Sequence, residues 1–103
     1  MPSSGKGSKL PILLTMGEPA GIGPEVALAA FEHFGGEIGG HPLKLVGDAD
    51  IFAGHKDALI PTTARAVRSP GKPDSANAAC VTEAIEIAVK ACMAGNAAAL
   101  VTA

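Results

Sequence analysis

The stretch Thr15-Met16-Gly17-Glu18-Pro19-Ala20-Gly21-Ile22-Gly23-Pro24-Glu25 decides how this chain folds. It follows an apolar run that ends at Leu14, and apolar residues recur at helical spacing after it. The stretch is therefore predicted to be a turn between a buried strand and a helix. Glycine permits positive φ angles, and Pro24 suits a first helical turn because its missing N–H would have no partner there. Such a turn directs N–H groups and a partial positive charge toward an anion.

Two better-known phosphate-binding motifs do not fit this turn. A G-x-G-x-x-G motif that starts at Gly21 would need glycine where Val26 stands, and a P-loop would need glycine where Ile22 stands. Two interpretations remain open. The turn is either a purely structural strand–helix connection or a loop that binds an anion at a helix N-terminus.

The decapeptide from Met16 to Glu25 strongly resembles the opening of the 4-hydroxythreonine-4-phosphate dehydrogenases, a family of pyridoxal phosphate biosynthesis. Residues 71–78 and 98–103 resemble the same family at the expected places. The resemblance covers nearly all of the chain from Leu10 onward, and its first motif is highly specific. More distantly, residues 21–25 resemble the isocitrate and isopropylmalate dehydrogenases.

The resemblance implies the N-terminal part of an isocitrate/isopropylmalate dehydrogenase-like three-layer α/β fold with a largely parallel sheet. It implies a full-length cytoplasmic homodimer that acts on a small phosphorylated substrate. With NAD or NADP, and a divalent metal such as zinc, magnesium or cobalt, that enzyme would oxidise and decarboxylate 4-phosphooxy-L-threonine to 3-amino-2-oxopropyl phosphate. The family's metal ligands lie beyond Ala103, so this fragment is expected to be inactive.

Two alternatives stay open: a related dehydrogenase of four-carbon sugar-acid phosphates, and a non-catalytic α/β module that binds an anion. If strands of the sheet are missing, its exposed edge is expected to pair with another chain or to aggregate.

The residues expected to bind the cofactor or line the cleft surround the glycine turn and open the long helix. Glu18 is interpreted as lining the cleft rather than carrying a proton, because no second titratable group stands at a fixed spacing from it. No catalytic residue or metal ligand is expected here, since His33, His41 and His55 match no compact ligand spacing. The expected site residues are Gly17, Glu18, Gly21, Ile22, Gly23 and Asn77.

Hydrophobic periodicity predicts alternating strands and helices, which is typical of an α/β fold with a largely parallel sheet. Asp48 or Asp50 is expected to cap a short helix that ends near His55, and Asp74 or Ser75 to cap the long helix. Residues 57–61 have an ambiguous pattern. Strands are predicted over 10–15, 43–46, 64–67 and 97–101, and the two longer helices over 22–34 and 76–94.

The composition predicts one globular unit with an aliphatic core: 48% of the 103 residues are hydrophobic, and the only aromatic residues are three Phe. A net charge of −2 without a basic cluster argues against a nucleic-acid partner, and no apolar run reaches membrane length. Residues 1–9 are expected to form a disordered leader, and residues 10–103 a truncated domain. Cys80 and Cys92 would lie about 18 Å apart along one helix, so they are expected to stay reduced.

Overall fold

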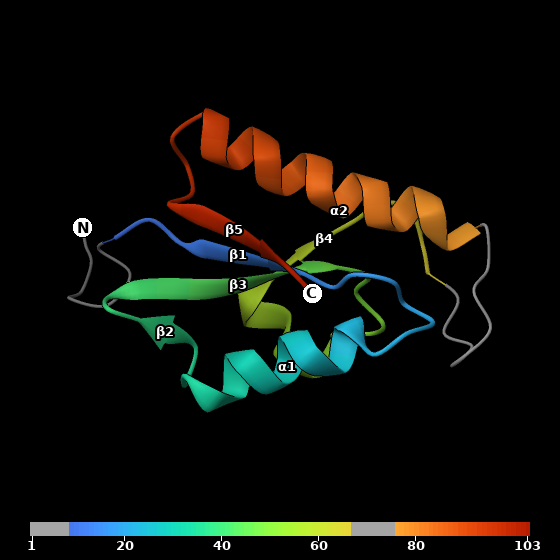
Figure 1. Ribbon diagram of the computed structural model, residues 1–103, viewed down its shortest axis with the longest axis horizontal. Helices are drawn as coiled ribbons and strands as arrows, with labels where there is room; N and C mark the ends of the chain where they lie inside the picture. Colours follow the sequence, from blue (N-terminus) through green and yellow to red (C-terminus); the bar gives the residue numbers. More distant parts are fainter. Residues whose placement is uncertain (1–8, 67–75) are drawn as a thin grey trace.

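The computed structural model describes residues 9–66 and 76–103. Figure 1 shows three layers, with a central sheet between two long helices. This arrangement confirms the α/β prediction, while the finer assignment to the isocitrate dehydrogenase-like class stays a prediction. In chain order the elements are β1 (Ile12–Thr15), α1 (Gly23–His33), β2 (Glu37–Ile38), β3 (His41–Gly47), the 3-10 helix η1 (Ala53–Ala58), β4 (Leu59–Pro61), α2 (Ala76–Met93) and β5 (Ala99–Thr102).

Four strands form a parallel sheet in the order β4-β3-β1-β5, and β2 adds a short antiparallel pair to the start of β3. The chain moves outward from β1 through β3 to β4, and then crosses over through α2 to β5 on the other side of β1. The direction of winding therefore reverses between β1 and β5. In open α/β sheets, ligands bind outside the carboxyl ends of the strands at such a point.

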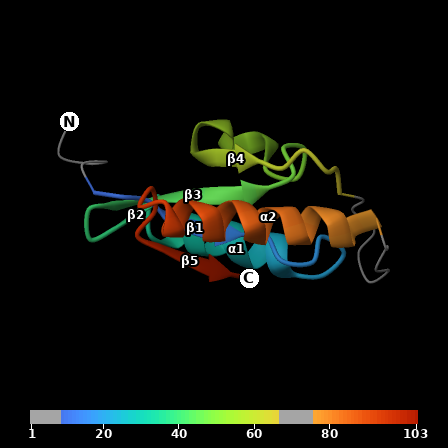
Figure 2. The same ribbon diagram turned by 90° about the horizontal axis from the view of Figure 1, so that it is seen from above.

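The two faces of the sheet carry separate cores because successive strand residues point to opposite sides. Leu14 and Met16 pack on the α1 face, whereas Leu13 packs with Ala84 and Ala88 on the α2 face. Figure 2 shows α2 along the sheet, with β4 and η1 on one side of it and β5 on the other. The apolar run before the glycine turn is thus a parallel strand covered on both faces, as predicted.

The predicted strand over 64–67 is wrong. The third parallel strand is β4, which comes from the segment with the ambiguous pattern, and residues 64–66 form no strand. The N–H groups of Ala64 and Ala66 donate instead to the carboxylates of Glu83 and Asp48, at 2.8 Å each. Side chains distant in the sequence therefore take the donors that a strand would have used.

The predicted cap of the short helix is also wrong. The helix η1 begins after Phe52, and Asp48 accepts N–H bonds in the turn that precedes it. The longer helices are followed by glycines with positive φ, which are Gly35 after α1 and Gly95 after α2. The cysteines are free.

Several predictions lie outside the described residues: the caps at Asp74 or Ser75, the last residue of the strand predicted over 64–67, and the leader apart from Lys9. Within the described ranges, no helix combines the length and apolar character needed to cross a membrane.

Candidate functional site at the glycine turn

The glycine turn lies at the carboxyl end of β1, where the winding of the sheet reverses. It is fastened to both neighbouring strands. The N–H of Met16 donates to the carbonyl of Val46 on β3 at 3.2 Å, and the N–H of Ala103 donates to the carbonyl of Thr15 at 3.3 Å. The predicted turn therefore occupies the place where α/β folds of this winding hold ligands.

Gly17 and Gly23 are required by the chain's own backbone. Gly17 has a φ of +69°, and a Cβ there would collide with the carbonyl oxygen of Ala103. A Cβ at Gly23 would collide with the carbonyl oxygen of Met16. Protein atoms already fill the space beside both glycines, so a structural role is sufficient to explain them. Gly21 differs, since a Cβ there would make only an ordinary contact of 3.5 Å with the Glu18 carbonyl oxygen.

Glu18 and Asn77 meet across 59 residues of sequence. Oε1 of Glu18 accepts a hydrogen bond from Nδ2 of Asn77 at 3.2 Å and another from the N–H of Ala20 at 3.0 Å. Asn77 is fully buried in the first turn of α2, whereas Glu18 is exposed. This bond ties the start of α2 to the glycine turn and brings together two of the six expected site residues.

Ile22 does not join that pair. It is the residue before the first turn of α1, its side chain is 73% exposed, and no side chain caps this helix by a hydrogen bond. An exposed isoleucine at this position leaves apolar surface available to a ligand or to another polypeptide.

Sequence reasoning missed Thr15, the last residue of β1. Its side chain is 1% exposed, and its hydroxyl has no hydrogen-bond partner in the described part of the chain. The register places Thr15 beside Thr102 of β5, at the reversal of winding. A buried hydroxyl without a partner costs about 1–3 kcal/mol, so this position favours a water molecule or a ligand group. The available signal was a polar residue that ends an apolar strand directly before a glycine turn.

A second polar cluster, also missed, follows β3. The Asp48 carboxylate is buried, and it accepts bonds from Nε of Arg65 at 2.9 Å and from the N–H groups of Ala66 at 2.8 Å, Asp50 at 2.7 Å and Ile51 at 3.3 Å. Burial alone would raise the pKa of Asp48, but the Arg65 guanidinium and these N–H groups lower it to about 2. Asp48 is thus held ionised as a structural clamp. It lines a pocket together with Asp50, Ile51 and Ala66.

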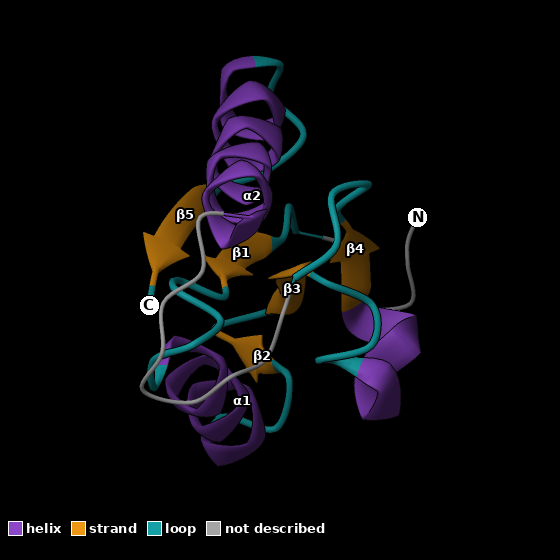
Figure 3. Ribbon diagram, turned by 90° about the vertical axis from the view of Figure 1, so that its right-hand side faces the viewer, coloured by secondary structure: helices purple, strands orange, loops and turns teal. Residues whose placement is uncertain are grey.

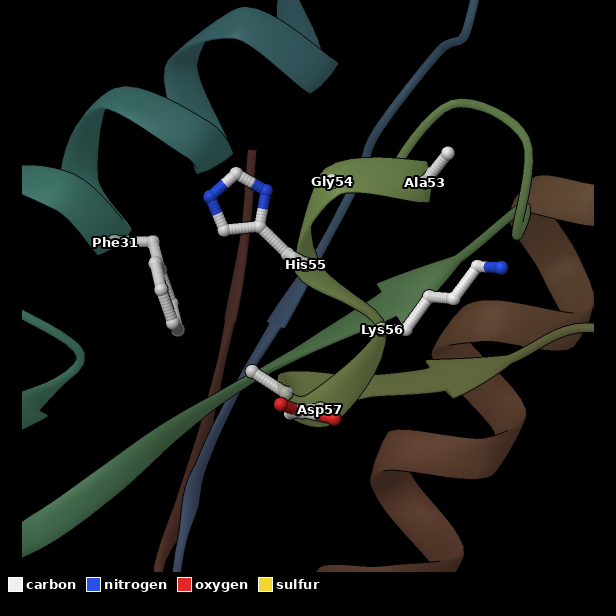
Figure 4. A pocket seen from close by; sticks show the side chains of 7 residues that line it. Phe31, Ala53, Gly54, His55, Lys56 and Asp57 are labelled. Carbon is white, nitrogen blue, oxygen red and sulfur yellow. The ribbon is translucent and has the colours of Figure 1, made fainter.

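A further pocket lies between α1 and η1, where the His55 ring points toward Phe31 while Lys56 points away from it (Figure 4). The two rings meet edge to face with centroids 5.3 Å apart, and Nε2 of His55 lies 3.6 Å from a carboxylate oxygen of Glu32. None of the six expected site residues lines this pocket. It therefore does not coincide with the expected cleft.

The residues in the described ranges include no group of three or more His, Cys, Asp or Glu that could hold a metal ion. The described residues therefore do not fit a divalent metal site.

The chain is similar to curated 4-hydroxythreonine-4-phosphate dehydrogenases, although no family model matches it. The relative from Methylorubrum extorquens (strain PA1) is 35% identical over 118 aligned positions, which cover 89% of this chain and 34% of the relative. Those from Maricaulis maris and Roseobacter denitrificans are 36% and 39% identical, over 90% of this chain and 35% and 33% of their own length.

The chain thus spans about a third of the length of these relatives. The alignment with the Methylorubrum protein has 118 positions and this chain has 103 residues, so that relative carries additional residues inside the matched region. The resemblance expected from residues 16–25 is confirmed, and the chain is related in sequence, over about nine tenths of its length, to the 4-hydroxythreonine-4-phosphate dehydrogenases.

Proposed function

We propose that this chain forms one wall of the cleft in a 4-hydroxythreonine-4-phosphate dehydrogenase. The assembled enzyme would oxidise 4-phosphooxy-L-threonine with NAD, and the resulting β-keto acid would lose carbon dioxide to give 3-amino-2-oxopropyl phosphate. The observation that carries the proposal is the position of the most specific motif, residues 16–25, at the reversal of winding between β1 and β5. The names of the curated relatives support the reaction class.

In this proposal the residues of the turn position ligands and carry out no chemistry themselves. Asn77 and the N–H of Ala20 hold the Glu18 carboxylate by its Oε1, which supports a fixed position for Glu18 as a residue that lines the cleft. The buried Thr15 hydroxyl, at the end of β1 directly before the turn, has one hydrogen bond to offer. NAD, when bound, supplies the hydride acceptor, and the ligands of the divalent metal would come from polypeptide other than the described residues.

A chimera tests the proposal. This chain replaces the aligned third of the Methylorubrum extorquens relative, and NADH formation is followed by absorbance with 4-phosphooxy-L-threonine and a divalent metal. We expect NADH formation by the chimera, and none by the isolated 103-residue chain. A folded chimera that makes no NADH would contradict the proposed function, and NADH from the isolated chain would contradict its expected inactivity.

Two variants of the chimera examine the Glu18–Asn77 pair. Glu18→Gln keeps an oxygen that can accept from Asn77 but removes the charge, and Asn77→Ala removes the tie between α2 and the turn. We expect both to raise the KM for NAD or substrate more than they lower kcat, because both groups position ligands. Activity with a four-carbon sugar-acid phosphate in place of 4-phosphooxy-L-threonine would favour the alternative substrate class.

A further inference from the structure

The sheet has an open edge at β5. β5 is the last strand of the sheet, and among the described residues none pairs with its outer edge. Its Val101 side chain is 52% exposed, although β1 beside it is covered on both faces. Figure 3 shows this strand at one side of the sheet, with α2 on one face and α1 on the other.

The orientation of α2 places an apolar flank on the same side. Glu83 faces β4, because its carboxylate accepts bonds from Thr63 and from the N–H of Ala64, directly after that strand. At 100° per residue, Ile85 and Val89 lie on the opposite flank of the helix, toward β5. Each of these two side chains is 38% exposed.

On the opposite face of the sheet, the orientation of α1 also places an apolar flank on the β5 side. Phe31 and Glu32 meet His55 of η1, on the side of β4. The helical spacing then puts Ile22 and Val26 on the flank that faces away from η1. Their side chains are 73% and 47% exposed.

We define the β5 face as the outer edge of β5 together with the apolar flanks of α1 and α2 beside it. An open edge strand with apolar side chains above and below is the surface that the next strand and helix of an α/β sheet would bury. Extensive apolar surface beside unpaired strand edges marks a binding interface in a soluble protein. The exposed side chains of the β5 face are Ile22, Val26, Ile85, Val89 and Val101.

We propose that the β5 face binds a polypeptide that adds a strand along β5, and that this polypeptide corresponds to the two thirds of the curated relatives that the chain does not match. The relatives carry that additional length, whereas this chain covers 34% of the Methylorubrum protein. A second copy fits less well, because an isologous two-fold contact would pair β5 with β5 antiparallel in a sheet that is parallel from β4 to β5.

Binding, and not activity, tests this proposal, so its failure is separable from failure of the proposed function. The Methylorubrum extorquens relative is produced without its aligned third and titrated by calorimetry with the complete 103-residue chain. The aligned third of the relative itself is the positive control. Amide exchange by mass spectrometry then reports on β5. We expect a one-to-one complex and slower exchange over Ala99–Thr102.

A matched pair of variants locates the contact. Ile85→Gln/Val89→Gln changes the β5 flank of α2, and Glu86→Gln/Lys90→Gln changes the neighbouring exposed positions one residue further along. We expect the first pair to raise Kd at least tenfold and the second less than twofold, with unchanged circular dichroism for both. The proposal is overturned by equal effects of the two pairs, by a complex that leaves β5 exchange unchanged, or by no complex. It is equally overturned by a homodimer of this chain that the first pair dissociates.

Discussion

The two edges of the sheet present different chemistry. On the β4 side, carboxylates distant in the sequence bind the segment after the strand: Asp48 holds Arg65 and Ala66, and Glu83 holds Thr63 and Ala64. On the β5 side, the described chain presents aliphatic side chains beside an unpaired strand edge. Backbone N–H groups that donate to carboxylates are satisfied in water, whereas exposed aliphatic side chains gain free energy only when something covers them.

The largest loss of stability is expected at the glycine turn, which lies at the end of the central strand β1. Gly23→Ala should lower the free energy of unfolding by about 3 kcal/mol, because the added methyl collides with the Met16 carbonyl oxygen and the backbone must shift. Urea denaturation followed by circular dichroism measures this change. Gly21→Ala is the control and should cost less than about 1 kcal/mol, since its methyl has ordinary contacts. Equal losses in the two variants would show that the turn is not packed as described.

A slightly smaller effect is expected on the β4 side. Asp48→Asn replaces an acceptor oxygen by an NH2 group that faces donors, so about 2–3 kcal/mol should be lost. Asp50→Asn is the matched control, because the Asp50 side chain is 87% exposed, and its loss should stay below about 1 kcal/mol. Losses of similar size in both variants would remove the distinction between a buried clamp and a surface ion pair.

The pH dependence gives an independent measure of that clamp. The pKa of Asp48 falls from an ordinary value of 3.8 to about 2 on folding, so its carboxylate stabilises the fold above pH 4. That contribution, about 2 kcal/mol, should disappear as the pH falls from 4 to 2. The difference in unfolding free energy between Asp48→Asn and the unchanged chain should shrink over this interval. A constant difference down to pH 2 would be inconsistent with an ionised, hydrogen-bonded Asp48.

The smallest effect is expected on the β5 side. Ile85→Gln/Val89→Gln should change the stability of the isolated chain by less than about 1 kcal/mol, because both side chains are already partly in water. Ala84→Gln, one residue away on the same helix, should cost about 3 kcal/mol because Ala84 is 1% exposed in the core. Thermal melts of the two variants compare these costs. A large loss from the first would show that the β5 face is already covered in the isolated chain.

Periodicity within one segment was sufficient for much of the fold. The glycine turn, both long helices and the strands β1, β3 and β5 follow from apolar spacing and from glycine and proline at element ends. The third strand, β4, could not be predicted, because only three residues form it. The segment after it, which was predicted as a strand, is held instead by the carboxylates of Glu83 and Asp48. Such long-range hydrogen bonds leave no local pattern.

The candidate site shows the same division. Its place at the end of β1 was predictable from the turn itself. The bond between Glu18 and Asn77 was not, because it joins residues 59 positions apart. The burial of Thr15 depends on α2 covering that face of the sheet, which no property of residues 10–15 indicates. The glycines at 17 and 23 could be expected to be necessary, but only the structure shows that backbone carbonyls, and not a ligand, occupy the space beside them.

The two cysteines of α2 should react with thiol reagents at different rates, because they lie on the same helix but differ in burial. Cys80 is buried against Thr62, at 3.3 Å from its hydroxyl, and burial raises the pKa of its thiol. Cys92 is only partly covered. An alkylating reagent should therefore label Cys92 first, and the slower labelling of Cys80 should time the rare events in which α2 lifts away from the sheet. The ratio of the two labelling rates therefore measures how often α2 opens locally.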